Sequence, residues 1–432
     1  MKKFLGVLLA ASIGVSLIAC GSAGSGSKSE GSNGDVVNLT IWSPTDTEPV
    51  EAWWADKLAQ WNEENPGIQV TREAIDRSDS YAYENKVTTA TTSNDLPDLL
   101  YVDGPNISYY AANGLIVPLT DYFTDEDLAD LMPCTVQQCT YDDTLYAVSA
   151  TESSVALYYN KDYLDAAGIA YPSEDNIEEA WTWSEFYENT GKLTTGDYVG
   201  TSIIMDKGEG LIYALGQFWT ENNAQMISED GTEADGYINS KESVETAEYL
   251  VQFIENGYAN LDPVKDEFLN GYAATMLGGS WNIGEVEASD LNWGVSYFPI
   301  SDEGKASSPT GDWSVAITKD SKNVDAAGKF IQWFMSTDNV ASYASAIVKP
   351  ASRISAYEQM EGWEEGPRAL MLWQLQNTGT ARPNSPSYSV LSSDFASALL
   401  NIFSGADIQS EFDKVAVSFD DNYKDYYAES EK

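Results

Sequence analysis

The sequence of 432 residues contains no histidine at all. Without histidine, a Ser-His-Asp or Cys-His catalytic arrangement cannot form, and every histidine-based metal site is excluded. Basic residues are also scarce, with 23 lysines and arginines against 68 aspartates and glutamates and a net charge of −45. Because nucleic-acid binding needs basic contacts to phosphates, we expect no nucleic-acid partner. The acidic excess favours solubility and leaves neutral or cationic small ligands open.

A hydrophobic run long enough to span a membrane comfortably is also missing. The apolar run over residues 4–18 follows two lysines and has the length of a secretory signal. It ends in the sequence Leu-Ile-Ala-Cys at residues 17–20, which resembles the lipobox of bacterial lipoproteins. The resemblance implies a signal peptide over 1–19 and lipidation of Cys20. The alternative is an ordinary signal peptide with a chance cysteine.

The residues after Cys20 are almost entirely glycine, serine, alanine and asparagine up to Asp35. Such a segment buries too little apolar surface to fold, so we expect a flexible tether over 20–35. The remaining length, about 400 residues, allows two domains or lobes.

Cysteine is scarce, since only Cys134 and Cys139 remain beside Cys20. In an exported chain, two cysteines five residues apart predict a local disulfide. Free thiols are the alternative, and a metal site would need two further ligands. We expect no metal and no cofactor.

The folded part begins with alternating strand and helix patterns. A strand is predicted over 36–42, an amphipathic helix over 50–61, and a second strand over 68–72 after the breaker Asn65-Pro66-Gly67. This order predicts a parallel β-α-β unit. Further predicted elements are a helix over 81–92, a strand over 96–102, helices over 161–167, 241–256 and 325–335, and a capping box formed by Thr182 and Glu185.

A series of short motifs resembles the sugar-binding group of extracellular solute-binding proteins of ATP-driven importers. Each motif is weak alone, but their order over some 350 residues is specific to the family. The motifs are Leu39–Trp42, Trp61–Val70 with its Asn-Pro-Gly-Ile junction, Leu96–Asp98 followed by Asp103, Gly114–Leu119, Leu145–Val148, Leu157–Asp162, Ala167–Ile169, Trp181–Phe186, Gly271–Met276, Gly279–Trp281, Pro299, Ser321–Asn323 and Ala326–Ile331.

The resemblance implies an α/β, two-lobe periplasmic-binding-protein-like fold of type II, with a multi-crossing hinge and the ligand cleft between the lobes. Hinge crossings are expected near 149–151, 310–313 and 349–351. Lobe 1 would contain residues 36–148 and 314–349, and lobe 2 residues 149–313 and 350–432.

The function that the resemblance implies is that of the substrate-binding component of an ABC carbohydrate importer. It would capture a neutral sugar, an oligosaccharide rather than a monosaccharide, outside the cell and deliver it to the permease subunits. The protein would be a monomer that contacts the membrane only through the lipid on Cys20, on the extracellular face.

Aromatic candidates for the ligand site come from the thirteen tryptophans of the chain. Trp281 and Trp313 lie in aperiodic Gly/Ser-rich segments beside Asn282 and Asp312, and Trp219 precedes a polar Glu-Asn-Asn run. Aromatic rings bury the apolar faces of sugars, and amides or carboxylates bind the hydroxyls. The alternative for each tryptophan is core packing, which the helical spacing of Trp53 and Trp61 predicts for those two.

Polar candidates lie where the predicted cleft would be. Asp46 and Asp103 follow predicted strands, at the sheet edge where ligands bind in parallel α/β folds. Glu152 lies at the first expected hinge crossing. Arg382 lies in a proline-rich loop at a position that lines the cleft in the resembled family, and a surface ion pair is its alternative.

Two other functions remain open at this point. An exported glycosidase could use two of the many carboxylates. A sensor or adhesin could also be built on the same fold.

Overall fold

The structure, a computed structural model, describes residues 36–76 and 82–426. The expected signal peptide, Cys20 and the tether lie outside these residues, as does Tyr81 at the start of one predicted helix. Within the described ranges, no helix is both long enough and apolar enough to cross a membrane.

The first sheet has five strands in the order β2-β1-β3-β12-β6. β1 pairs in parallel with β2 and β3, whereas β12 is antiparallel to both β3 and β6. Helix α1 connects β1 to β2, so the predicted parallel β-α-β unit is confirmed. The bounds are β1 Val37–Pro44, α1 Glu48–Glu64, β2 Ile68–Ile75, β3 Leu99–Asp103, β12 Trp313–Ile317 and β6 Ala147–Val148.

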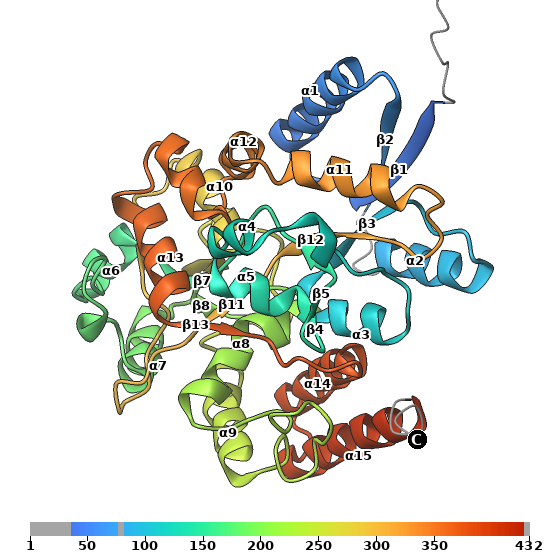
Figure 1. The fold of residues 1–432 in the computed structure, drawn as a ribbon. Helices are drawn as coiled ribbons and strands as arrows, with labels where there is room; N and C mark the ends of the chain where they lie inside the picture. The colour runs from blue at the N-terminus through green and yellow to red at the C-terminus, as the bar shows by residue number, and fades with distance from the viewer. Residues whose placement is uncertain (1–35, 77–81, 427–432) are drawn as a thin grey trace, which may run out of the picture. The chain divides into compact units, whose positions relative to one another are not determined.

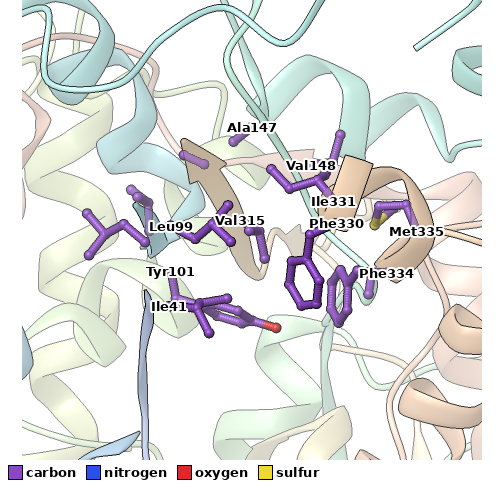
Figure 2. Packing of buried hydrophobic residues seen from close by; sticks show 14 of the residues in the cluster. Ile41, Leu99, Tyr101, Ala147, Val148, Val315, Phe330, Ile331, Phe334 and Met335 are labelled. Carbon is purple, nitrogen blue, oxygen red and sulfur yellow. The ribbon is translucent and has the colours of Figure 1, made fainter. Parts of the chain in front are cut away.

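A large apolar core covers this sheet, and we call the sheet and this core lobe 1. Side chains of β1, β3, β6 and β12 meet helix α11 (Val324–Phe334), as Figure 2 shows. Trp54 of α1 stacks on Phe334 with ring centroids 5.4 Å apart. Trp53 and Trp61 are buried in the same core, as their helical spacing predicted.

The second sheet has four strands in the order β10-β7-β9-β8, and we call this sheet with its helices lobe 2. Its central strand β7 is buried along its whole length, because β9 and β10 flank it and helices cover it. β7 is antiparallel to both neighbours, and β8 is parallel to β9. The bounds are β7 Val155–Asn160, β8 Val199–Ser202, β9 Ala273–Gly279 and β10 Trp293–Ser296.

Two pairs of helices that are far apart in the sequence pack together in lobe 2. Helices α8 (Glu209–Glu221) and α9 (Lys241–Glu255) contact α14 (Tyr388–Phe403), which also packs on α15 (Ile408–Tyr426). Figure 1 shows the two C-terminal helices in red beside the green α8 and α9. The C-terminal segment therefore completes the core of lobe 2.

Local signals set several helix ends. α6 (Lys161–Ala167) has the predicted bounds and ends at Gly168, whose φ of 68° is the left-handed conformation that glycine adopts easily. The predicted capping box of Thr182 and Glu185 is present at the start of α7 (Trp183–Leu193). The other helices are α2 Ala82–Ser93, α3 Ile107–Ala112, α4 Asp125–Ala129, α5 Pro133–Gln138, α10 Ile283–Glu287, α12 Thr337–Ile347 and α13 Gly366–Asn377.

Three chain segments run side by side between the two sheets and form the hinge. The Glu152 amide donates to the Pro350 carbonyl at 2.8 Å, and the Ser352 amide donates to Ala150 at 3.0 Å. The Ser149 hydroxyl donates to the Trp313 carbonyl at 2.8 Å. Two short strands, β11 (Ser308–Thr310) and β13 (Gly379–Ala381), pair beside them, and β4 (Thr140–Tyr141) pairs with β5 (Thr144–Leu145).

The exact lobe limits stay a prediction. The side chains of Ala351, Ala356, Met360 and Trp363 belong to the core of lobe 1. Leu370 of α13 belongs instead to a small core that includes Tyr158 of β7. These contacts favour a return of the chain to lobe 2 after Trp363 rather than at residue 350.

The expected disulfide is wrong for this structure, because Cys134 and Cys139 are both free. Cys134 lies in the short helix α5 and Cys139 caps its C-terminus. Five residues along a helix rotate a side chain by roughly 140°, so the two thiols point in different directions. The Cys139 sulfur instead lies 3.4 Å from the Ser314 hydroxyl of β12.

Candidate binding cleft

A cavity of about 540 Å³ opens between elements of both lobes, and we call it the cleft. Lobe 1 contributes the loop after β1 (residues 43–47) and Asp103 at the end of β3. Lobe 2 contributes the first turns of α8 and Trp281, and the hinge contributes residues 311–313 and Lys349. The carboxyl ends of β1 and β3 face it, as expected for parallel strands in a ligand-binding α/β fold.

Six of the nine residues predicted to bind ligand line this cleft. They come from five separate parts of the chain, which only the tertiary fold brings together. They are Asp46, Asp103, Trp281, Asp312, Trp313 and Arg382.

The other three predicted residues do not line the cleft. Trp219 is 1% exposed and packs in the core of lobe 2 against Phe395 and Phe412 of α14 and α15. It borders a separate hollow beside α8 instead. Asn282 holds a turn, because its side-chain oxygen accepts a hydrogen bond from the Gly279 amide at 2.9 Å.

Glu152, the third of these, is fully buried inside the hinge. Its carboxylate accepts hydrogen bonds from the Thr135 hydroxyl at 2.5 Å and from the Gln138 amide at 3.0 Å. Its other oxygen accepts from the Gly311 amide at 2.9 Å. Burial raises the pKa of this carboxyl to about 7. Glu152 therefore connects α5 to the hinge, and it holds these segments together instead of lining the cleft.

Arg382 joins the two lobes across the cleft. Its guanidinium donates to both oxygens of Asp103, at 2.9 and 3.0 Å, and to Glu209 at 2.5 Å. The Arg382 side chain is only 5% exposed, and its Cζ atom lies 4.9 Å from the ring centroid of Tyr213. Burial raises the pKa of Glu209, and the Arg382 cation opposes this effect. The surface ion pair considered for Arg382 is thus a buried one inside the cleft wall.

Asp312 is held by three elements. Its carboxylate accepts from the Lys349 ammonium at 2.9 and 3.1 Å, from the Thr151 hydroxyl at 2.7 Å and from the Trp313 amide at 2.9 Å. The Lys349 ammonium also lies 5.6 Å from the centroid of the Trp281 ring. These contacts fix Trp281 against a charged hinge pair.

Six aromatic rings of the described residues line the cleft. Trp281 tilts against Tyr213 with centroids 5.9 Å apart, and Trp313 meets Tyr83 edge-on at 5.5 Å. Both tryptophans are half-buried. The six lining aromatics are Trp54, Tyr101, Tyr213, Trp281, Trp313 and Tyr343.

The sequence interpretation missed several lining residues. Arg72 of β2 binds Glu51 at 2.6 Å and the Pro44 carbonyl at 2.8 Å, and so holds the loop that carries Asp46. Glu209 and Lys349 were also missed. All three are charged residues in or beside regular elements, where a solvated surface position is the ordinary expectation.

Comparison with known proteins identifies the family. The family model described as "Bacterial extracellular solute-binding protein" matches residues 57–369. The chain belongs to this family. This agrees with the motif series and with the two-lobe α/β fold.

Curated proteins of similar sequence are described as sugar-binding proteins. The maltodextrin-binding protein MdxE of Bacillus subtilis is 23% identical over 402 residues, covering 89% of each chain. A maltooligosaccharide ABC transporter solute-binding lipoprotein of Streptococcus pneumoniae is 22% identical over 84% of this chain and 83% of that protein. The maltotriose-binding protein of Pyrococcus abyssi is 25% identical, but the match spans only 54% of its length.

The fold matches that of a Listeria monocytogenes ABC substrate-binding protein in complex with cycloalternan. The TM-score is 0.77 at 21% identity, and the match covers 90% of this chain and all of that one. A Bdellovibrio bacteriovorus maltose/maltodextrin-binding domain bound to maltotriose matches with a TM-score of 0.75 at 17% identity, again over 90% of this chain and all of that one. At these identities the likeness shows the fold alone.

Proposed function

We propose that this protein is the substrate-binding component of an ABC carbohydrate importer. It captures a neutral oligosaccharide outside the cell and delivers it to the membrane permease. The membership of the solute-binding family supports binding rather than catalysis.

The lining of the cleft carries this proposal. Six aromatic rings, several carboxylates and three cations of the described residues line a cavity of about 540 Å³, a volume within the ~300–1,000 Å³ typical of small-molecule sites. Aromatic rings can bury the C–H faces of pyranose units while charged and amide groups bind the hydroxyls. Relatives described as maltodextrin-, maltooligosaccharide- and maltotriose-binding proteins support an oligosaccharide as ligand.

In this proposal the predicted residues have separate roles. Trp281 is the main stacking surface, with help from Trp313. Asp46, Asp103, Asp312 and Arg382 bind hydroxyls or hold the groups that do. Closure of the lobes at the hinge encloses the ligand, because a few element-terminal residues can absorb such a motion.

The protein acts as a monomer on the extracellular face, tethered through the lipid on Cys20. The description of the S. pneumoniae relative as a lipoprotein supports this anchoring. Cys20→Ala should release the protein from membrane fractions or block its processing. Unchanged membrane retention of that variant would count against the anchor.

Thermal-shift and calorimetric titration with glucose, maltose, maltotriose, maltotetraose and cellotriose tests the binding function. A ligand at about 100 times its Kd should stabilise the folded state by ~2.7 kcal/mol and so raise the melting temperature. No response to any carbohydrate would contradict the proposal. Release of shorter sugars on prolonged incubation would instead favour the glycosidase alternative.

A further inference from the structure

Among the residues that the structure describes, every cation that lines the cleft is already paired with a carboxylate of the protein. Arg72 pairs with Glu51 at 2.6 Å, and Lys349 pairs with Asp312 at 2.9 Å. Arg382 pairs with Asp103 and with Glu209. Among the described lining residues, no cation is therefore left over for an anionic group of a ligand.

Three carboxylates in the same lining form no ion pair with any residue of 36–76 and 82–426, although the Lys349 cation, already paired with Asp312, lies near enough to Asp46 to lower the pKa of that carboxyl. The Asp46 carboxylate accepts one hydrogen bond from the described residues, donated by the Thr47 amide at 2.7 Å. One oxygen of the Asp206 carboxylate accepts hydrogen bonds from the Gly208 and Gly210 amides at the start of α8, and its other oxygen has no hydrogen-bond partner among the described residues. Glu285 of α10 forms no ion pair or hydrogen bond with any described residue, and its side chain is exposed to the cleft.

These three carboxylates stand on both walls of the cleft. Asp46 follows β1 of lobe 1, whereas Asp206 precedes α8 and Glu285 lies on α10, both in lobe 2. A ligand held between the lobes therefore meets unneutralised negative charge from two sides. A concave site lined by one sign of charge also focuses the field and speeds the entry of ligands of opposite charge.

We infer that the cleft selects carbohydrates by charge, and that Asp46, Asp206 and Glu285 are the residues that determine this selectivity. It accepts neutral sugars, binds an amino sugar more tightly than its neutral counterpart, and rejects uronates, aldonates and sugar phosphates. The inference rests on the proposed function, since it names the class of carbohydrate that the same cleft takes. A cleft whose carboxylates were all neutralised by protein cations would give no such order, because a neutral ligand and an amine of equal size would then bind alike.

Matched ligand triplets test the inference. The first triplet is maltotriitol, its 1-amino-1-deoxy derivative and maltotrionate, which share an opened terminal unit and differ in charge. The second is glucose, glucosamine and glucuronate. Calorimetry in dilute buffer should show the amine binding tightest and the acid weakest, with about tenfold or more between them. High salt should reduce the differences in affinity between the amine, the neutral sugar and the acid, since salt screens exposed charges.

The variants Glu285→Gln and Asp206→Asn test whether these two carboxylates cause the charge selectivity. Each should lower the affinity ratio of amine to neutral sugar severalfold, and melting curves confirm that the variants are folded. Glu303→Gln is the matched control, because Glu303 is an exposed acid outside the cleft, and it should leave the ratio unchanged.

The outcomes separate the inference from the proposed function. Neutral sugars that bind with affinities equal to those of the amine and the acid overturn the charge inference alone. Tighter binding of the acid overturns it as well. Failure of every member of both triplets, together with failure of the wider neutral panel, overturns the binding function and the inference with it.

Discussion

Lys349 and Asp312 form a nearly buried ion pair at the point where the hinge meets the cleft. The ammonium lies 2.9 and 3.1 Å from the two carboxylate oxygens, and the side chains are 11% and 5% exposed. The same ammonium faces the Trp281 ring. This pair links α12, which precedes Lys349, to β12, which follows Asp312, and so couples the hinge to the proposed stacking surface.

Asp312→Asn should destabilise the protein strongly, because it leaves the Lys349 cation buried without its partner. Breaking a buried pair in this way costs about 3–5 kcal/mol. Denaturant unfolding of the mature protein measures the loss. Asp262→Asn is the control, since Asp262 pairs with Lys207 on the surface and is 81% exposed. The control should change the unfolding free energy by less than about 1 kcal/mol. Equal losses of unfolding free energy in the two variants would contradict a larger contribution of the buried pair to stability.

Glu152 should make the folded state less stable as the pH rises. Burial raises the pKa of the Glu152 carboxyl to about 7 in the folded state, from its ordinary value of 4.5. Between these values the folded protein holds a proton that the unfolded chain has released, so the unfolding free energy falls with increasing pH. The full effect of this shift is roughly 3 kcal/mol and is complete above pH 7.

Urea unfolding of the parent and of Glu152→Gln between pH 4 and 8 isolates this contribution. Other groups titrate in both proteins, so the difference between the two curves is the informative quantity. The Asp312, Arg382 and Thr135 side chains that surround Glu152 are unchanged in the variant. The parent should lose stability relative to the variant as the pH rises. A constant difference across the range would contradict the raised pKa.

Both cysteines should titrate as free thiols once the protein is denatured without reductant. In the native protein both should react slowly, because burial raises the pKa of Cys134 and raises that of Cys139 to about 12. Cys139 is fully enclosed and Cys134 partly exposed, so Cys134 should react first. Mass spectrometry after timed alkylation identifies the order. If the denatured, unreduced protein shows no reactive thiol, the two cysteines are disulfide-bonded and the prediction of free thiols is wrong.

Local signals explain which parts of the fold the sequence predicts. The spacing of Val50, Trp53 and Trp61 predicts the buried stripe of α1, and Gly168 predicts the end of α6, because each depends on neighbouring residues only. Trp219 was misplaced because the polar run after it suggested a loop. In the structure α8 extends to Glu221 and is buried on nearly all sides. Periodicity cannot show a stripe on a helix that is buried all round.

The cleft partners could not be predicted, because they are far apart in sequence. Arg382 and Glu209 are separated by 173 residues, and Arg382 and Asp103 by 279. Glu209 looks like a surface charge until the fold brings it to Arg382, whereas Arg382 was placed at the cleft only by the family resemblance. The strand-end rule located Asp46 and Asp103, since it is a property of parallel sheets and not of side-chain pairing.

Trp281→Ala should weaken carbohydrate binding by about ten- to a hundredfold, because stacking one sugar face on an indole is worth roughly 1–3 kcal/mol. Trp281 is half-buried at the cleft, so its removal should change the fold little. Calorimetry with the sugar that gives the largest thermal shift measures the loss, and Trp281→Phe should restore part of it. Trp333→Phe is the control, since Trp333 packs against the core of lobe 1 outside the cleft. If Trp281→Ala binds as tightly as the parent, Trp281 is not the stacking surface, and Trp313 becomes the residue to test.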